Sequence, residues 1–221
     1  MKSLFITASG TDIGKTHAAT LMIRQLMARG RKVQALKPLL TGFQLDEMQA
    51  SDSGLLLAAL GRPVTMRNIE AITPWRFSAP LAPDMAARLE GRPQVRLAEV
   101  TEFCNAARQG SDHILLIEGV GGVLAPVNDQ YTVRDWIGAL KMPALLVTGS
   151  YLGCISHTLT ALEALQGRNI AVAGIVVSES ISAPPLDETL RTMANFIKGV
   201  RLLPLPRAPG AVGPDLTQLL D

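Results

Sequence analysis

The 221-residue sequence predicts an α/β protein with a doubly wound, mostly parallel sheet in a single domain. Short apolar runs that suit buried strands alternate with longer stretches of helical periodicity, which is typical of a parallel sheet covered by helices. Hydrophobic residues make up 48% of the chain and charged residues 18%, a balance that allows a substantial core. No repeat, linker or low-complexity segment indicates a second domain, so we expect residues 1–221 to fold as one.

The first half of the chain predicts two strands, several helices and one irregular stretch. Gly30 is a plausible stop for the first long helix, and Gly61 and Pro63 end the second. Three prolines interrupt the stretch that follows, which therefore reads as irregular with aromatic packing anchors. We expect strands at Leu4–Thr7 and Val33–Leu36, helices at Thr16–Arg29, Asp52–Leu60, Asp84–Leu89 and 97–107, and irregular structure over Thr65–Pro83, anchored by Trp75 and Phe77.

The second half continues the alternation and ends in a Pro-rich tail. The apolar run before Glu118 is the strongest strand signal in the chain. We expect strands at His113–Ile117, Ala144–Val147, Ile170–Val177 and Val200–Leu203, and helices at Ser156–Leu165 and Leu186–Ile197.

Charge and cysteine content narrow the classes of function. The net charge is +2 and there is no Lys/Arg block, so nothing indicates a nucleic-acid or membrane partner. The N-terminus runs directly into a strand and the apolar runs are too short to span a bilayer, so we expect a cytoplasmic protein. Cys104 and Cys154 lack the spacing of a metal site or redox pair; reduced thiols are the simpler interpretation, and a disulfide stays open.

The segment Ala8–Thr16 predicts a nucleoside triphosphate site. Gly14-Lys15-Thr16 follows a strand and opens a helix, which is the setting of a P-loop. The backbone N–H groups at the helix start favour phosphate, Lys15 adds charge toward the β and γ phosphates, and the Thr16 hydroxyl can bind Mg²⁺. The usual P-loop pattern begins with a glycine, but this chain has Ser9 at that position and a glycine at Gly10. A chance occurrence of Gly-Lys-Thr at a strand-helix junction is therefore the alternative interpretation.

Further polar residues follow the other strands, and the carboxyl ends of parallel strands meet at one edge. Glu118 ends the strongest strand, where P-loop enzymes place an acid that holds Mg²⁺. Lys37 ends the second strand and could neutralise charge during phosphoryl transfer. Asp52 precedes a helix, where a metal ligand and an N-cap are both open. A solvated lysine and a turn-capping acid are the alternatives for Lys37 and Glu118.

The motifs, in their order along residues 3–178, resemble the dethiobiotin synthetase family. They are Gly-Thr-Asp-Ile-Gly-Lys-Thr at the loop, Leu36-Lys37-Pro38-Leu39-Leu40-Thr41-Gly42, Ser51-Asp52, Thr73-Pro74-Trp75-Arg76-Phe77, Glu118-Gly119-Val120-Gly121-Gly122 and Leu152-Gly153-Cys154-Ile155-Ser156-His157-Thr158.

The resemblance implies a P-loop NTPase fold and one reaction. The family closes the ureido ring of dethiobiotin from 7,8-diaminopelargonic acid, CO₂ (or bicarbonate) and ATP. A carbamate of the diamine attacks the γ-phosphoryl group, and the neighbouring amine then attacks the carbamic-phosphoric anhydride and releases phosphate. In the family one substrate-binding segment comes from the partner subunit, so the resemblance also implies a homodimer.

The resemblance also implies a role for each matching residue. It makes Lys37, Lys15 and Thr11 catalytic, and Thr16, Asp52 and Glu118 the ligands of Mg²⁺. It makes Asp12, Ile13, Gly14, Lys15, Thr16, His17, Glu118, Gly121, Ser178, Glu179 and Pro206 the nucleotide-binding residues. It makes Thr41, Gly42, Val120, Gly121, Leu152, Gly153 and Ser156 the substrate-binding residues.

The chain departs from the family pattern in the loop and at the base site, and it also has Ser156 in place of a common Asn and Asp84 where many relatives have His. Ala8 and Asp12 replace the usual glycine and a longer acid, and Ser178-Glu179 stands where the family often reads adenine with Asn. The base preference is therefore open, and CTP or GTP is expected to replace ATP in part.

Three rival functions are alternatives to this interpretation. A partitioning or cell-division ATPase switch usually carries a lysine five residues before Lys15, where this chain has Gly10. A small-molecule kinase usually needs an arginine-rich lid, which the sequence lacks. A nucleotide-binding pseudoenzyme is the third rival.

Overall fold

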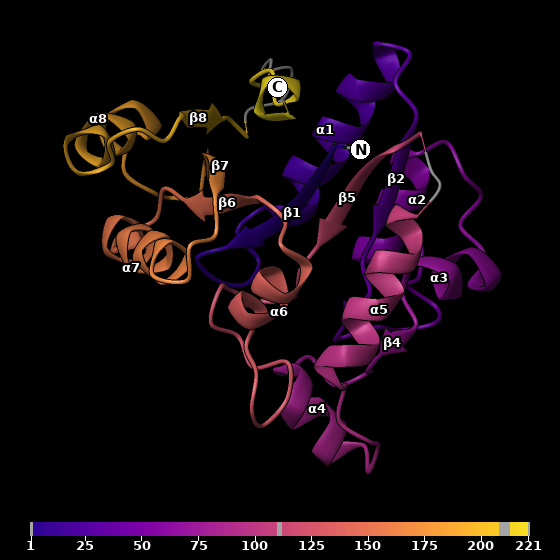
Figure 1. The fold of residues 1–221 in the computed structure, drawn as a ribbon. Coiled ribbons are helices and arrows are strands. Elements are labelled where there is room, and N and C mark those ends of the chain that lie inside the picture. Colours follow the sequence, from indigo (N-terminus) through magenta and orange to yellow (C-terminus); the bar gives the residue numbers. More distant parts are fainter. Residues whose placement is uncertain (1, 110–111, 208–212, 221) are drawn as a thin grey trace.

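A computed structural model describes residues 2–109, 112–207 and 213–220. Within these ranges a six-stranded parallel sheet has the order β2-β5-β1-β6-β7-β8. The prediction of a doubly wound, mostly parallel sheet is confirmed. In Figure 1, β2 lies toward one side of the molecule and β8 toward the other. The strands are β1 (Ser3–Ala8), β2 (Val33–Leu36), β5 (Ile114–Glu118), β6 (Ala144–Gly149), β7 (Val172–Ser178) and β8 (Leu202–Leu205).

The strand order places the functional loop at the centre of the sheet. From β1 the chain crosses to β2 at one edge of the sheet, and β5 later pairs between β2 and β1. The strands β6, β7 and β8 then extend the sheet from β1 in the other direction. The order therefore reverses beside β1, and the loop after β1 opens at the point where such sheets bind ligands.

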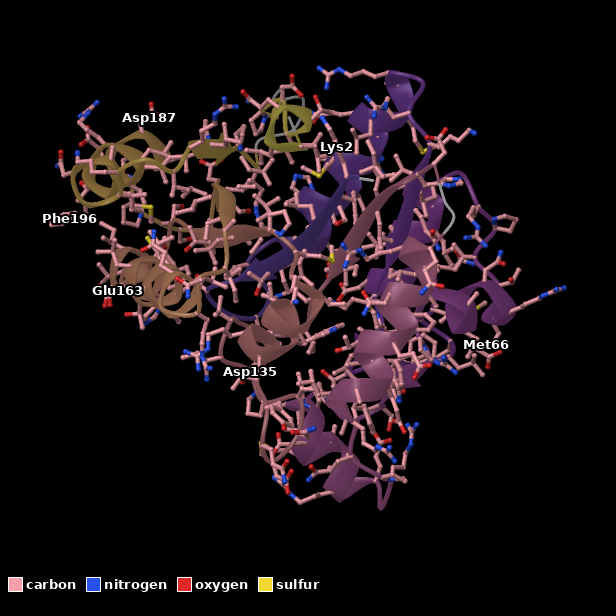
Figure 2. The ribbon with its side chains drawn as sticks, viewed as in Figure 1. Lys2, Met66, Asp135, Glu163, Asp187 and Phe196 are labelled. Atoms are coloured by element: carbon pink, nitrogen blue, oxygen red, sulfur yellow. The ribbon has the colours of Figure 1, made fainter. Side chains whose placement is uncertain are left out.

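Helices connect the strands and extend the molecule at both sides. Figure 2 shows Glu163 on α7 and Phe196 on α8 at one side, and Met66 on α3 at the opposite side. None of the helices in the described ranges is long and apolar enough to cross a membrane. The helices are α1 (Lys15–Ala28), α2 (Asp52–Ala59), α3 (Met66–Ile72), α4 (Pro83–Leu89), α5 (Leu97–Arg108), α6 (Val133–Leu140), α7 (Cys154–Gln166), α8 (Leu186–Phe196) and the 3₁₀ helix η1 (Thr217–Leu220).

The prediction of irregular structure over Thr65–Pro83 is wrong. Thr65 caps the seven-residue helix α3 by accepting from the Asn68 N–H at 3.3 Å. The strand β4 (Trp75–Arg76) then pairs with β3 (Leu39–Leu40) in a separate two-stranded sheet. The pairing of β3 with β4 joins residues far apart in the chain, which local composition does not reveal. The anchors are confirmed, because Phe77 is buried and Trp75 packs edge-on against Phe103.

Helix α6 was missed, although a local signal existed. The Thr132 and Asp135 side chains form a reciprocal capping box at its start, which is a recognised helix-initiation motif. The helix is short, which makes its periodicity hard to see in the sequence. Other strand ends differ by one or two residues: Ile170–Val177 is observed as Val172–Ser178, and Val200–Leu203 as Leu202–Leu205.

The core packs between the sheet and the helices around Phe5 and Trp136. Both side chains are fully buried, and their rings meet edge to face with centroids 4.9 Å apart. Cys104 and Cys154 are both buried and free, as the simpler reading of the sequence predicted. Burial raises the pKa of the Cys104 thiol to about 12, so this thiol is unreactive at neutral pH.

Replacing Trp136 by Ala is expected to lower the free energy of unfolding by about 3–5 kcal/mol, because it removes a large buried side chain and leaves a cavity. Chemical denaturation measures this change. Phe196→Ala is the matched control, since Phe196 is 64% exposed and its loss is expected to cost less than about 0.5 kcal/mol. Equal losses in the two variants would contradict the assigned core.

Candidate functional site

The loop between β1 and α1 has a backbone shape that requires glycine at its end. Gly14 has φ 102°, and a Cβ there would lie 2.7 Å from the Ser178 Oγ. Asp12 also has a positive φ, 56°, which Asp tolerates better than most residues. Gly14 is the N-cap of α1, and no side chain of the described residues caps this helix. The first turn of α1 is therefore suited to an anion, as the P-loop interpretation requires.

Lys15 is held within this loop. It is only 7% exposed, and its Nζ donates to the Gly10 carbonyl at 3.1 Å. Burial, and secondarily the charge of Lys37, lowers the pKa of Lys15 to about 8. A nearby phosphate would favour the charged form. The site thus contains a buried ammonium group whose charge an anionic ligand would stabilise.

Lys37 is the centre of a buried ionic cluster. Its Nζ lies 2.7 Å from Glu118 Oε1 and 2.8 Å from Asp52 Oδ2, and it also donates to the Gly119 carbonyl at 2.9 Å. The Thr16 hydroxyl lies 2.7 Å from Asp52 Oδ1 and 2.8 Å from Glu118 Oε1. The end of β2, the start of α2, the end of β5 and the start of α1 therefore meet at one point.

The pKa directions in this cluster follow from burial and pairing. Burial alone would lower the pKa of Lys37, but the charges of Glu118 and Asp52 raise it. Burial raises the pKa of Glu118, partly opposed by Lys37. Burial would also raise the pKa of Asp52, but the Lys37 charge and hydrogen bonds hold it below its usual value. Lys37 is therefore held in its charged form. The alternative interpretation of Lys37 as a solvated lysine at a strand end is wrong, because the side chain is buried.

The same residues fit a magnesium ion. Glu118 Oε2 is buried and has no hydrogen-bond partner among the described residues. Thr16, Asp52 and Glu118 offer hydroxyl and carboxylate oxygens, the ligands that Mg²⁺ prefers. In the described part of the chain no three His, Cys, Asp or Glu side chains gather as a metal site. Mg²⁺ commonly takes one or two carboxylates together with substrate phosphates.

A cavity of about 300 Å³ opens above this cluster. It gathers eleven of the residues predicted from the sequence. Leu40 and Arg207 also line it and were not predicted. Arg207 follows β8, so the rule that ligands bind beyond the carboxyl ends of strands could have identified it. The predicted lining residues are Thr11, Asp12, Gly14, Lys15, Thr16, His17, Lys37, Thr41, Asp52, Val120 and Gly121.

The other predicted residues do not line this cavity. Glu118 is buried and reaches the site through Thr16 and Lys37. The Gly42 N–H donates to the Ala79 carbonyl, so it is already paired. The remaining residues off the lining are Ile13, Ser178, Glu179, Pro206, Leu152, Gly153 and Ser156.

The start of α7 is exposed and lies outside the cavity lining. Leu152 is 90% exposed, and Gly153 has φ 95° at the N-cap. Ser156 is also exposed. The Tyr151 hydroxyl and His157 Nδ1 lie 2.9 Å apart across this helix start.

A chain of hydroxyl groups links the loop to α7. Ser9 Oγ lies 3.0 Å from Thr148 Oγ1, which lies 2.7 Å from Thr158 Oγ1. Thr158 donates in turn to the Cys154 carbonyl at 2.6 Å. Thr148 and Thr158 are fully buried. Ser9, which departs from the usual P-loop glycine, therefore ties the loop to β6 and α7.

Comparison with known families matches residues 2–214 to the AAA domain family. The chain is 46% identical over 207 residues to the ATP-dependent dethiobiotin synthetase BioD of Caulobacter sp. (strain K31), covering 94% of this chain and 89% of that one. It is 44% identical over 215 residues to the ATP-dependent dethiobiotin synthetase BioD of Methylobacterium nodulans, covering 95% of both.

Among solved structures, the cell-division protein MinD of Aquifex aeolicus matches with a TM-score of 0.53 at 12% identity, over 95% of this chain and 84% of that one. The septum site-determining protein MinD of Pyrococcus horikoshii matches with a TM-score of 0.53 at 18% identity, over 94% and 82% of the two chains. At these identities the likeness supports the P-loop NTPase fold alone, which agrees with the fold predicted from the sequence.

Replacing Lys37 by Gln is expected to lower the free energy of unfolding by about 3 kcal/mol, because it leaves two carboxylates without their buried cation. The same loss should make Mg²⁺ more stabilising for the variant than for the wild type, since Glu118 and Asp52 then lack other neutralisation. Thermal unfolding with and without Mg²⁺ measures both effects. Lys198→Gln is the control, because Lys198 is exposed and follows α8. An identical Mg²⁺ response in variant and wild type would refute the metal assignment.

Proposed function

The chain belongs to the ATP-dependent dethiobiotin synthetases, ligases of biotin biosynthesis, and on this basis we propose that it closes the ureido ring of dethiobiotin from 7,8-diaminopelargonic acid, CO₂ and ATP. One observation of the structure supports this most directly. Two buried lysines, Lys15 and Lys37, line the same cavity as the phosphate-binding loop. A reaction that brings two anions together needs such concentrated positive charge.

The proposed chemistry has two steps. The carbamate oxygen of the diamine attacks the γ-phosphorus of ATP, and the bond to the β-phosphate oxygen breaks to release ADP. The second amine then attacks the carbonyl carbon of the carbamic-phosphoric anhydride, which forms the ring C–N bond and expels phosphate. Both steps depend on positioning more than on covalent catalysis by the protein.

Lys15 and Lys37 neutralise the charge that builds up as carbamate and triphosphate meet. Lys15 acts at the β and γ phosphates, and Thr11, which lines the cavity, donates its hydroxyl there. Lys37 reaches the transferring group from the buried side, and its bonds to Glu118 and Asp52 hold it charged and in place. Bound Mg²⁺, held by Thr16, Asp52 and Glu118, would supply further positive charge at the phosphates.

The substrate is proposed to bind beside the loop. Thr41, Val120 and Gly121 line the cavity, and Gly42 follows Thr41 in the chain. In a homodimer, the exposed start of α7, with Leu152, Gly153 and Ser156, is proposed to bind the carboxylate of the substrate that occupies the site of the partner subunit. Its exposure in one chain supports this assignment.

The nucleotide contacts are proposed to run from the loop toward the ends of β7 and β8. Asp12, Ile13, Gly14 and His17 belong to the loop and the first turn of α1, and Ser178 lies beside Gly14. Glu179 and Pro206 follow β7 and β8. As a consumer of ATP, the protein is proposed to work in the cytoplasm, with residues 1–221 as a single domain.

Release of phosphate from ATP is expected to require both the diamine and bicarbonate. Omitting either one should reduce the steady-state rate to background, because no carbamate then exists to accept the phosphoryl group. Coupled phosphate detection measures the rate, and mass spectrometry of the product identifies dethiobiotin. Phosphate release that is indifferent to the diamine would instead favour a switch ATPase related in fold to MinD.

The nucleotide base is expected to be discriminated weakly. The Glu179 carboxylate accepts from the Arg207 backbone N–H at 2.8 Å, so part of its hydrogen-bonding capacity is already used. Without a dedicated amide at this position, kcat/KM for CTP and GTP should lie within about tenfold of that for ATP, because strong discrimination needs buried polar groups matched to one base. A preference for ATP of several hundredfold would contradict this expectation.

A further inference from the structure

Arg207 is a cation at the nucleotide cavity that the sequence did not indicate. It lies two residues after β8 and lines the cavity together with Lys15, Thr16 and His17. Its side chain is exposed, unlike those of Lys15 and Lys37. The guanidinium group of arginine presents several N–H donors in one plane, which suits a phosphate group.

Glu179 holds the segment that carries Arg207. The Glu179 N–H donates to the Leu205 carbonyl at 2.9 Å, which continues the pairing of β7 with β8. The Arg207 N–H donates to Glu179 Oε2 at 2.8 Å, and Arg207 Nε donates to the Glu179 carbonyl at 3.2 Å. These bonds use Arg207 Nε and leave the terminal nitrogens of the guanidinium as the donors that can face a ligand.

The charges around the cavity divide into two groups. Lys37 and Glu118 end β2 and β5, which lie on one side of β1 in the sheet, at the end where the γ-phosphate is expected. Arg207 follows β8, on the other side of β1, and lines the cavity together with His17. Arg207 therefore enters the cavity from the side opposite Lys37 and Glu118. A P-loop lysine marks the β and γ phosphates, so this other end belongs to the α-phosphate and the nucleoside.

We propose that Arg207 binds the α-phosphate of the nucleotide and that Glu179 acts as its positioning residue. This inference rests on the proposed function only in that the cavity binds a nucleoside triphosphate. It assigns to Glu179 a role in holding the β8 end rather than in reading the base.

Binding of adenosine, AMP, ADP and ATP to the full chain tests the assignment. Arg207→Ala is expected to weaken AMP, ADP and ATP alike, by roughly tenfold for the loss of one charge-assisted contact at an exposed site, and to leave adenosine unchanged. Displacement of a fluorescent ATP analogue, without Mg²⁺, measures each affinity. Arg24→Ala is the matched control, because it removes an exposed cation that also acts on His17 but does not line the cavity.

The positioning role of Glu179 has its own readout. Glu179→Ala should weaken AMP binding, and the double variant with Arg207→Ala should bind no more weakly than Arg207→Ala alone, because both changes remove one contact. Arg207→Lys should recover part of the affinity. Melting temperatures near that of the wild type verify that each variant is folded.

Three results would overturn the inference. They are a loss for adenosine as large as for AMP, a loss confined to ATP, and an equal loss in Arg24→Ala. Additive losses in the double variant would overturn the role of Glu179 alone. All of these experiments measure nucleotide affinity and not the ring-closure reaction. A protein that does not catalyse ring closure would therefore still give a result on Arg207. An unchanged nucleotide affinity in Arg207→Ala would refute the Arg207 assignment without refuting the proposed reaction.

Discussion

The buried ammonium of Lys37, enclosed by Glu118 and Asp52, is the interaction on which the site depends. A buried charge is tolerated only when its partners satisfy it, and removing one partner is strongly destabilising. Here the partners come from β2, β5 and α2, and the hydroxyl of Thr16 on α1 joins them. The folding of four separate elements is therefore coupled to the assembly of one ionic cluster at the carboxyl edge of the sheet.

The charge balance of this cluster explains how it can serve both stability and chemistry. Lys15 and Lys37 are matched by Asp52 and Glu118, so these four groups carry no net charge when all are ionised. A bound triphosphate adds negative charge that they do not offset. Thr16, Asp52 and Glu118 offer the oxygens at which a divalent cation can supply the difference, and Glu118 Oε2 has no hydrogen-bond partner in the described ranges. Arg207, at the other end of the cavity, adds positive charge that is not consumed by this cluster.

The chain's departures from the usual P-loop also acquire physical roles. Ser9 replaces the usual first glycine, and its hydroxyl begins the hydrogen-bonded series through Thr148 and Thr158 to α7. Ser178-Glu179 stands outside this loop, where the family resemblance places an adenine-reading Asn, and Glu179 is bonded to the chain that follows β8. Ser9 therefore supports the loop, whereas Glu179 supports the segment after β8.

The role of Asp52 came from the family resemblance, but the alternation of strands and helices, the phosphate-binding loop and the meeting of Lys37 with Glu118 were determined by the sequence by itself. These follow from local patterns: apolar runs, a Gly-Lys-Thr at a strand-helix junction, and polar residues at strand ends, which parallel pairing brings to one edge. Only the tertiary structure decided that Lys37 is bonded to the acids, that β3 pairs with β4, and that Arg207 lines the cavity. The physical reason is that these features join residues far apart in the chain, and their energies come from burial and pairing across elements, which no local pattern encodes.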